Sequence, residues 1–280
     1  MSRPAPTFER EPTRDGRSPL AFLVLVLGLS VPFWVGGAVI GGTAFLPAGL
    51  PVTLFQFVCP LLTASYLTYR RDGRAAVGRL LRRTWSLRGL ESRWLWGVAL
   101  VPACGLLTYA LLPVAGVSRG GPHEPLGVAA LMLVAGFLMA GAEETGWTGY
   151  AAGPLRARYG ALGAGVVLGV VWAAWHVPAL LQAHRPALWI AGWALGTIAG
   201  RILIVRLVEN TGGAVVVAVA VHDLMIVTTA LIPHFEIEPR PAVAVLNGLI
   251  MALAAAAVVL VGRRHPGPAL RTLRVGAPGR

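Results

Sequence analysis

Residues 125–149 read PLGVAALMLVAGFLMAGAEETGWTG, an apolar run that ends on two adjacent glutamates, Glu143 and Glu144. Crossing the hydrocarbon core of a bilayer takes about 20 predominantly apolar residues, so this run is long enough to span one. Similar runs recur along the 280-residue chain, which is 56% hydrophobic and only 13% charged. A soluble domain usually has about one quarter of charged residues. The sequence therefore predicts an all-α, polytopic membrane protein.

The apolar runs predict about eight transmembrane helices and no separate soluble domain. Their expected ranges are 19–41, 47–68, 94–116, 125–149, 160–182, 187–208, 212–232 and 241–262. We expect one membrane domain over residues 19–262, with a cytoplasmic N-terminal tail over 1–18 and a cytoplasmic C-terminal tail over 263–280. Glycine pairs spaced four apart, such as Gly165 and Gly169, would let neighbouring helices approach closely.

Arginine placement predicts the orientation in the membrane. The net charge is +12, and all 24 cationic residues are arginines. Most lie in the two tails or in connections on one predicted side, eight of them within 69–93, whereas the opposite connections carry only Arg119, Arg185 and Arg240. The positive-inside rule places both termini in the cytoplasm, with the protein integral to the plasma membrane. Orientation and anionic headgroups explain this charge better than a nucleic-acid partner does.

Ionisable residues inside the predicted spans are candidates for function, because burying them in a membrane is costly. Glu143 lies about six residues, or roughly 9 Å, inside its span, where partial desolvation favours a role as a base. Glu144 and Thr148 are four apart and can hydrogen-bond on one face of the helix. The alternative is that both carboxylates are solvated at the cytoplasmic edge.

Two later spans each carry a lone histidine. His176 follows Trp172 by one helical turn, and His222 stands next to Asp223. Each histidine could instead be a structural residue bonded to a neighbouring helix. Together with Glu143, however, they supply what is needed to activate a water molecule. Either Glu143 and His176 hold and deprotonate the water while His222 stabilises the oxyanion, or Glu143, His176 and His222 hold a zinc ion.

The depths of these residues pose a geometric problem for straight helices. From the cytoplasmic edge, His176 lies roughly 24 Å deep, His222 roughly 15 Å and Glu143 roughly 9 Å. Tilted spans, a later start of the fifth helix or a re-entrant segment would bring them together, around a water-filled cavity open to the cytoplasm. Arg201, inside the sixth span, can pair with a glutamate or Asp223, but the sequence favours snorkelling to the cytoplasmic edge.

Three motifs resemble those of the CPBP family, the CAAX-protease and bacteriocin-processing (Abi-type) membrane proteins. The family patterns are EExxxR, (F/W)xxxH and HxxxN, and the resemblance covers about residues 130–232. It implies that Glu143 is the catalytic glutamate, that His176 helps to position water and that His222 serves the oxyanion. Glu144, Thr148, Trp172 and Asp223 would be supporting residues. The family includes both metalloproteases and metal-independent glutamate proteases, so a zinc cofactor and a metal-free site both stay open.

Two positions depart from the family patterns. Thr148 stands where the arginine that ties the second glutamate is expected, and Ile226 stands where the asparagine is expected. Losing one oxyanion donor typically costs about 100- to 1000-fold in turnover.

The sequence predicts an intramembrane endopeptidase whose partners are the lipid bilayer and a peptide or membrane-anchored protein substrate. The alternative is a catalytically weakened or inactive immunity or partner-binding protein of the same fold. A transporter is a third hypothesis, which no inverted-repeat pattern supports.

Overall fold

The computed structural model describes residues 16–40, 52–87, 90, 96–121 and 125–264, and these contain helices and no strand. The prediction of an all-α protein is confirmed. The α-helices are α1 (Pro19–Ile40), α2 (Val58–Thr84), α3 (Trp96–Leu111), α4 (Leu126–Gly146), α5 (Gly153–Gln182), α6 (Ala187–Asn210), α7 (Val215–Leu231) and α8 (Pro241–Arg264). Three short helices adjoin them: η2 (Val52–Phe57), η4 (Leu112–Ala115) and the π-helix η5 (Trp147–Ala152).

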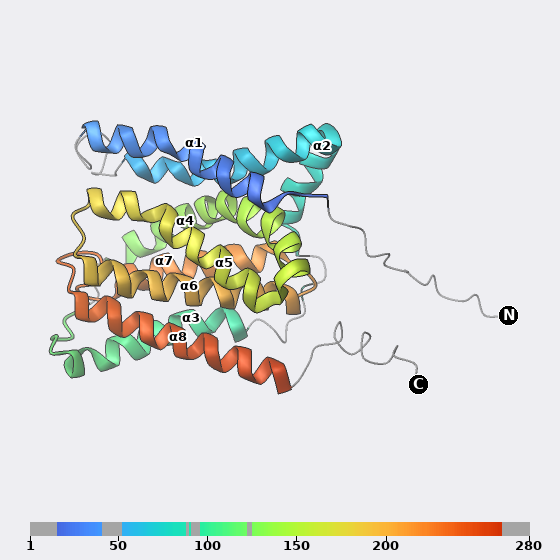
Figure 1. Cartoon of the computed structure of the whole chain (residues 1–280). Helices are drawn as coiled ribbons and strands as arrows, with labels where there is room; N and C mark the ends of the chain where they lie inside the picture. Colours follow the sequence, from blue (N-terminus) through green and yellow to red (C-terminus); the bar gives the residue numbers. More distant parts are fainter. Residues whose placement is uncertain (1–15, 41–51, 88–89, 91–95, 122–124, 265–280) are drawn as a thin grey trace.

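Each predicted span coincides with an α-helix, but several helices are joined end to end. The described residues form seven continuous helical runs, because α4, η5 and α5 follow one another directly. Among them, five runs are long and apolar enough to cross a membrane. One of these, Gly127–Gln182, has 56 residues, and the chain reverses direction within it (Figure 1). By length and hydropathy, fewer helical runs of the described residues can cross a membrane than the eight predicted.

Helices α2 and α7 are the two that fall short of a membrane span. α7 is apolar but has only 17 residues. In α2, a group of arginines lowers the mean hydropathy of the second half. Residues 69–84, predicted as part of a connection, are helical. Gly73, at φ 75°, breaks α2, and Gly160, at φ 70°, breaks α5 in the same way, because glycine reaches positive φ at little cost.

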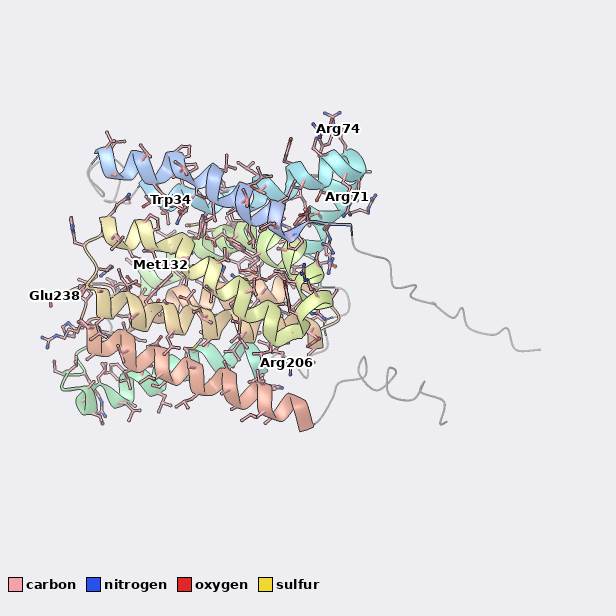
Figure 2. All side chains as sticks on the ribbon, in the orientation of Figure 1. Trp34, Arg71, Arg74, Met132, Arg206 and Glu238 are labelled. Atoms are coloured by element: carbon pink, nitrogen blue, oxygen red, sulfur yellow. The ribbon has the colours of Figure 1, made fainter. Side chains whose placement is uncertain are left out.

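The two ends of the bundle differ in charge. The first residues of α1 and the last residues of α8 lie at the same end (Figure 1). Arg71, Arg74 and Arg206 lie at that end, and Glu238 lies at the opposite end (Figure 2). The positions of these labelled residues agree with the predicted bias of arginines toward one end. The predicted tails fall almost entirely on residues 1–15 and 265–280, which lie outside the described residues.

Helix α6 lies at the centre of the bundle, and α1 lies at its edge. α6 packs against α5, α7 and α8. Close approach depends on glycine: a Cβ at Gly169 of α5 would lie 2.9 Å from the Cα of Ile198, and a Cβ at Gly192 of α6 would lie 2.5 Å from the nitrogen of Val245. Within the apolar 18-residue stretch of each helix, 56% is buried in α6 and 17% in α1. A polar side chain in the middle of α6 must therefore find its partners inside the protein.

Candidate active site

The π-helix η5 changes the depth of the glutamates. It continues α4 beyond the end predicted at residue 149, and all six of its residues, Trp147–Ala152, are buried. Glu143 therefore lies nine residues before the end of η5, or about 13 Å along a helix. The break at Gly160 makes the long segment of α5 begin at residue 161, one residue after the predicted start, so it leaves the depth of His176 almost unchanged. The extension of α4 by η5 therefore accounts for the smaller difference in depth.

Glu143 is buried, with 6% of its surface exposed. The indole nitrogen of Trp172 donates a hydrogen bond to Oε2 of Glu143 at 2.9 Å. Within the described residues, no hydrogen bond reaches the other carboxylate oxygen, Oε1. Sequence reasoning placed Trp172 beside His176 but did not predict its bond to Glu143.

Trp172 contacts all three predicted catalytic residues. Its ring centroid lies 4.7 Å from that of His222 and 5.6 Å from that of His176, both in edge-to-face geometry. Nδ1 of His176 lies 2.8 Å from the carbonyl oxygen of Trp172. A carbonyl only accepts, so Nδ1 carries the hydrogen and Nε2 of the neutral ring is left as an acceptor. Glu143, His176 and His222, from three different helices, thus converge on one side chain.

Glu144 is fully buried and has three partners. Nη1 of Arg201 donates to Oε2 at 2.8 Å, and the Thr148 hydroxyl donates to the same oxygen, which is the bond expected from their spacing. Nδ1 of His222 donates to Oε1 at 3.0 Å. These bonds offset the cost of removing a carboxylate from water. The alternative in which both glutamates are solvated at the membrane edge is wrong, because Glu143 and Glu144 are 6% and 0% exposed.

The prediction that Arg201 snorkels to the cytoplasmic edge is also wrong. Its side chain is fully buried, forms an ion pair with Glu144 and places Cζ 4.1 Å from the centroid of the Trp172 ring. The physical reason is the central position of α6, which leaves a long side chain no path along the protein surface. The sequence contained the signal, an arginine in mid-span, but did not show which way that side of the helix faces.

Asp223 lies against Gly136 of α4, seven residues before Glu143, and in the described part of the chain is not bonded to these residues. Its Oδ1 lies next to α4, where a Cβ on Gly136 would be 2.4 Å away, and has no hydrogen-bond partner among the described residues. Successive helical residues point about 100° apart, so His222 and Asp223 meet different neighbours. No hydrogen bond or ion pair within the described residues joins Asp223 to Glu143 or Glu144.

Two tryptophans and a serine that sequence reasoning did not single out support His176. The Trp175 ring lies 4.7 Å from the His176 ring, and its indole nitrogen donates to the Ser30 hydroxyl of α1 at 2.7 Å. Trp193 of α6 lies 5.4 Å from His176 between centroids. These residues look like ordinary aromatic and small residues of apolar helices, and only the packing shows that they surround the histidine.

The described residues give no support for a bound metal ion. Within the described residues, no group of three histidine, cysteine, aspartate or glutamate side chains is arranged to hold one. The zinc site predicted from Glu143, His176 and His222 is therefore not supported.

Fold and site together define a polytopic helical membrane protein with a buried cluster of glutamate and histidine. Residues 125–228 match the model of the Rce1-like family, described as type II CAAX prenyl endopeptidase Rce1-like. The match runs from the start of α4 into α7 and contains every predicted site residue. It covers 104 of the 280 residues and agrees with the resemblance to the CPBP family. No curated protein matches the chain.

Proposed function

We propose that the protein is an intramembrane endopeptidase that hydrolyses a peptide bond with water activated by Glu143 and His176. The observation that carries this proposal is the convergence of Glu143, His176 and His222 on Trp172. Glu143 keeps one carboxylate oxygen outside the bond to Trp172, and His176 keeps Nε2 as an acceptor. These two atoms are the candidates for holding the attacking water, and neither needs a metal ion.

In the proposed reaction, Glu143 removes a proton from the water while the water oxygen forms a bond to the scissile carbonyl carbon. The tetrahedral intermediate then collapses, the carbon–nitrogen bond breaks, and the protonated Glu143 returns the proton to the leaving amine. The hydrogen bond from Trp172 fixes one oxygen of Glu143 during both transfers. The position of the base is thus set before the substrate binds, and such positioning of reacting groups supplies much of the rate enhancement of enzymes.

His222 is the proposed donor to the oxyanion. Its Nδ1–H is bonded to Glu144, so Nε2 can donate only when the ring carries a second proton. Glu144 stabilises that cationic ring, and developing negative charge on the substrate oxygen strengthens the interaction. Ile226 supplies no second donor from the following turn, so we expect a modest turnover.

The test is cleavage of peptides and of membrane-tethered protein tails by the detergent-purified protein, compared with Glu143→Gln. Glutamine keeps the acceptor for Trp172 but cannot remove a proton. We expect cleavage by the wild type and a loss of at least about 1000-fold in the variant, of the order found for a missing catalytic base. A variant that cleaves as fast as the wild type would overturn the proposal.

A second candidate function is a non-catalytic membrane protein that binds a partner, and Ile226 is the observation that favours it. Ile226→Asn separates the two candidates. If the site is an enzyme lacking one oxyanion donor, the asparagine should raise turnover by about tenfold or more. If the substitution leaves a folded protein without cleavage, the binding function stands.

The orientation belongs to the same proposal. We place both termini in the cytoplasm and the membrane domain over residues 19–262, with the tails on either side. The support is the end of the bundle that carries Arg71, Arg74 and Arg206 (Figure 2). Single cysteines introduced into each tail and labelled with an impermeant reagent in sealed right-side-out vesicles test it, and tails that the reagent reaches from outside would overturn it.

A further inference from the structure

Arg201 is a buried charge whose bonding is incomplete. Its only hydrogen bond among the described residues is from Nη1 to Glu144, and its Nε and Nη2 are buried without a partner. Apolar side chains of similar volume often replace a buried ion pair with no loss of stability. Stability alone is therefore a weak reason for an arginine at this position, and its contacts point to another one.

Those contacts connect Arg201 to both glutamates. On one side its guanidinium holds Oε2 of Glu144, whose other oxygen orients His222. On the other side it lies over the ring of Trp172, whose indole nitrogen is bonded to Glu143. A guanidinium over an indole ring restrains the ring through a cation–π interaction. Arg201 thus restrains both Glu144, which orients His222, and Trp172, which is bonded to Glu143.

The backbone of α5 allows this arrangement. A Cβ at Gly169, three residues before Trp172, would lie 3.3 Å from the Cβ of Arg201 and 2.9 Å from the Cα of Ile198. Glycine at this position therefore lets α6 approach α5 closely enough for Arg201 to reach below the indole. Thr148, on η5, bonds to the same Glu144 oxygen as Arg201 does.

We propose that Arg201 is a positioning residue, which supplies from α6 the positive charge that holds Glu144 with His222 and keeps Trp172 aimed at Glu143. It does not touch substrate, because its side chain is fully buried. Since Thr148 and Arg201 share one acceptor oxygen, the charge is transferable: an arginine at 148 can take over the ion pair when the space of Arg201 is freed. The proposal rests on the peptidase function for its kinetic consequences.

The experiment compares the wild type, Arg201→Met, Thr148→Arg and the combination of the two, with kcat and KM measured on one tethered peptide. Arg201→Met should lower kcat by about 100-fold with little change in KM, the usual cost of a small misplacement of catalytic groups. Thr148→Arg alone should also lower kcat, because two guanidinium groups would crowd one carboxylate. The combination should recover to within about tenfold of the wild type, since the two changes are strongly coupled.

Arg206→Met is the matched control. Arg206 lies on the same helix and forms an ion pair with Glu209 at a partly exposed site. It should leave kcat within about twofold, because exposed ion pairs contribute little. If Arg201→Met does not fold, Arg201→Lys keeps a charge without the planar group over Trp172, and it should lose part of kcat at unchanged KM. A folded combination with no recovery, or Arg201 variants with wild-type kcat, would overturn the proposal.

Thermal unfolding separates this proposal from the peptidase function. Glu144→Gln, Arg201→Gln and the double variant form a cycle that needs no substrate. Coupled residues should give a double variant whose melting temperature falls by clearly less than the sum of the single shifts. If the wild type cleaves nothing, the peptidase function fails, but the cycle still tests whether Arg201 holds Glu144. Additive shifts in melting temperature would overturn the proposed role of Arg201.

Discussion

Glu143 and Glu144 are adjacent on α4, yet they belong to two different surroundings. Around Glu144, every carboxylate oxygen has a partner: Arg201, Thr148 and His222 together surround it. Around Glu143, a single indole donates to one oxygen, and His176 close by is partly exposed.

A carboxylate with all its bonds satisfied inside the protein has little capacity left for chemistry. One with a free oxygen beside a histidine can bind and deprotonate water. The difference between the neighbours therefore divides the site into a structural half and a reactive half. Substitutions that keep shape but remove one charge or one donor can test this division.

The largest effect on stability should come from Glu144→Gln. It leaves the Arg201 guanidinium buried without a counter-charge, and breaking a buried pair from one side typically costs about 3–5 kcal/mol. Unfolding by heat or by denaturing detergent measures it. Glu209→Gln is the matched control, because it removes the partly exposed pairs with Arg206 of α6 and Arg156 of α5 and should cost at most about 1 kcal/mol for each pair. Equal losses in the two variants would contradict the structural role of Glu144.

Trp172→Phe should mainly affect catalysis. Phenylalanine keeps a ring between the histidines but removes the donor to Glu143, and a hydrogen bond to a charged group contributes about 1.5–3 kcal/mol. We expect kcat to fall by about 10- to 100-fold at nearly constant KM, measured by steady-state cleavage. An unchanged kcat would mean that the indole nitrogen does not hold the base.

Trp175→Phe should have a smaller effect. It removes the hydrogen bond to Ser30 that ties α5 to α1 behind His176. We expect a loss of about 1 kcal/mol in the free energy of unfolding, the typical value for one neutral hydrogen bond. Melting curves of Trp175→Phe and Ser30→Ala should both shift to lower temperature, and a shift in only one of them would argue against a shared bond.

Asp223→Asn should have the smallest effect on activity. Asp223 faces Gly136 and carries an oxygen without a partner, so it contributes nothing to water activation. Turnover should stay within about twofold, and stability should rise slightly because a buried amide costs less than an unpaired carboxylate. Cleavage assays and melting curves on the same preparation test both, and a large loss of turnover would restore Asp223 to the site.

The positions of the helices could be predicted because apolar runs are set by the bilayer, whatever the helices pack against. The partners within the site could not. Gly160, where α5 breaks, is one of 35 glycines, and nothing in the sequence distinguishes it from the others. The ion pair of Arg201 depends on how α6 is rotated, which only its packing against α5, α7 and α8 determines. For the same reason, the bond from Trp172 to Glu143 was not predicted although both residues were.

One paired measurement tests the division most directly: turnover and melting temperature of Glu143→Gln and Glu144→Gln, prepared side by side. The account predicts that Glu143→Gln loses cleavage and melts close to the wild type, because the glutamine still accepts from Trp172. It predicts that Glu144→Gln melts at a much lower temperature, because Arg201 loses its partner. Two variants with the same melting temperature and the same residual turnover would contradict it.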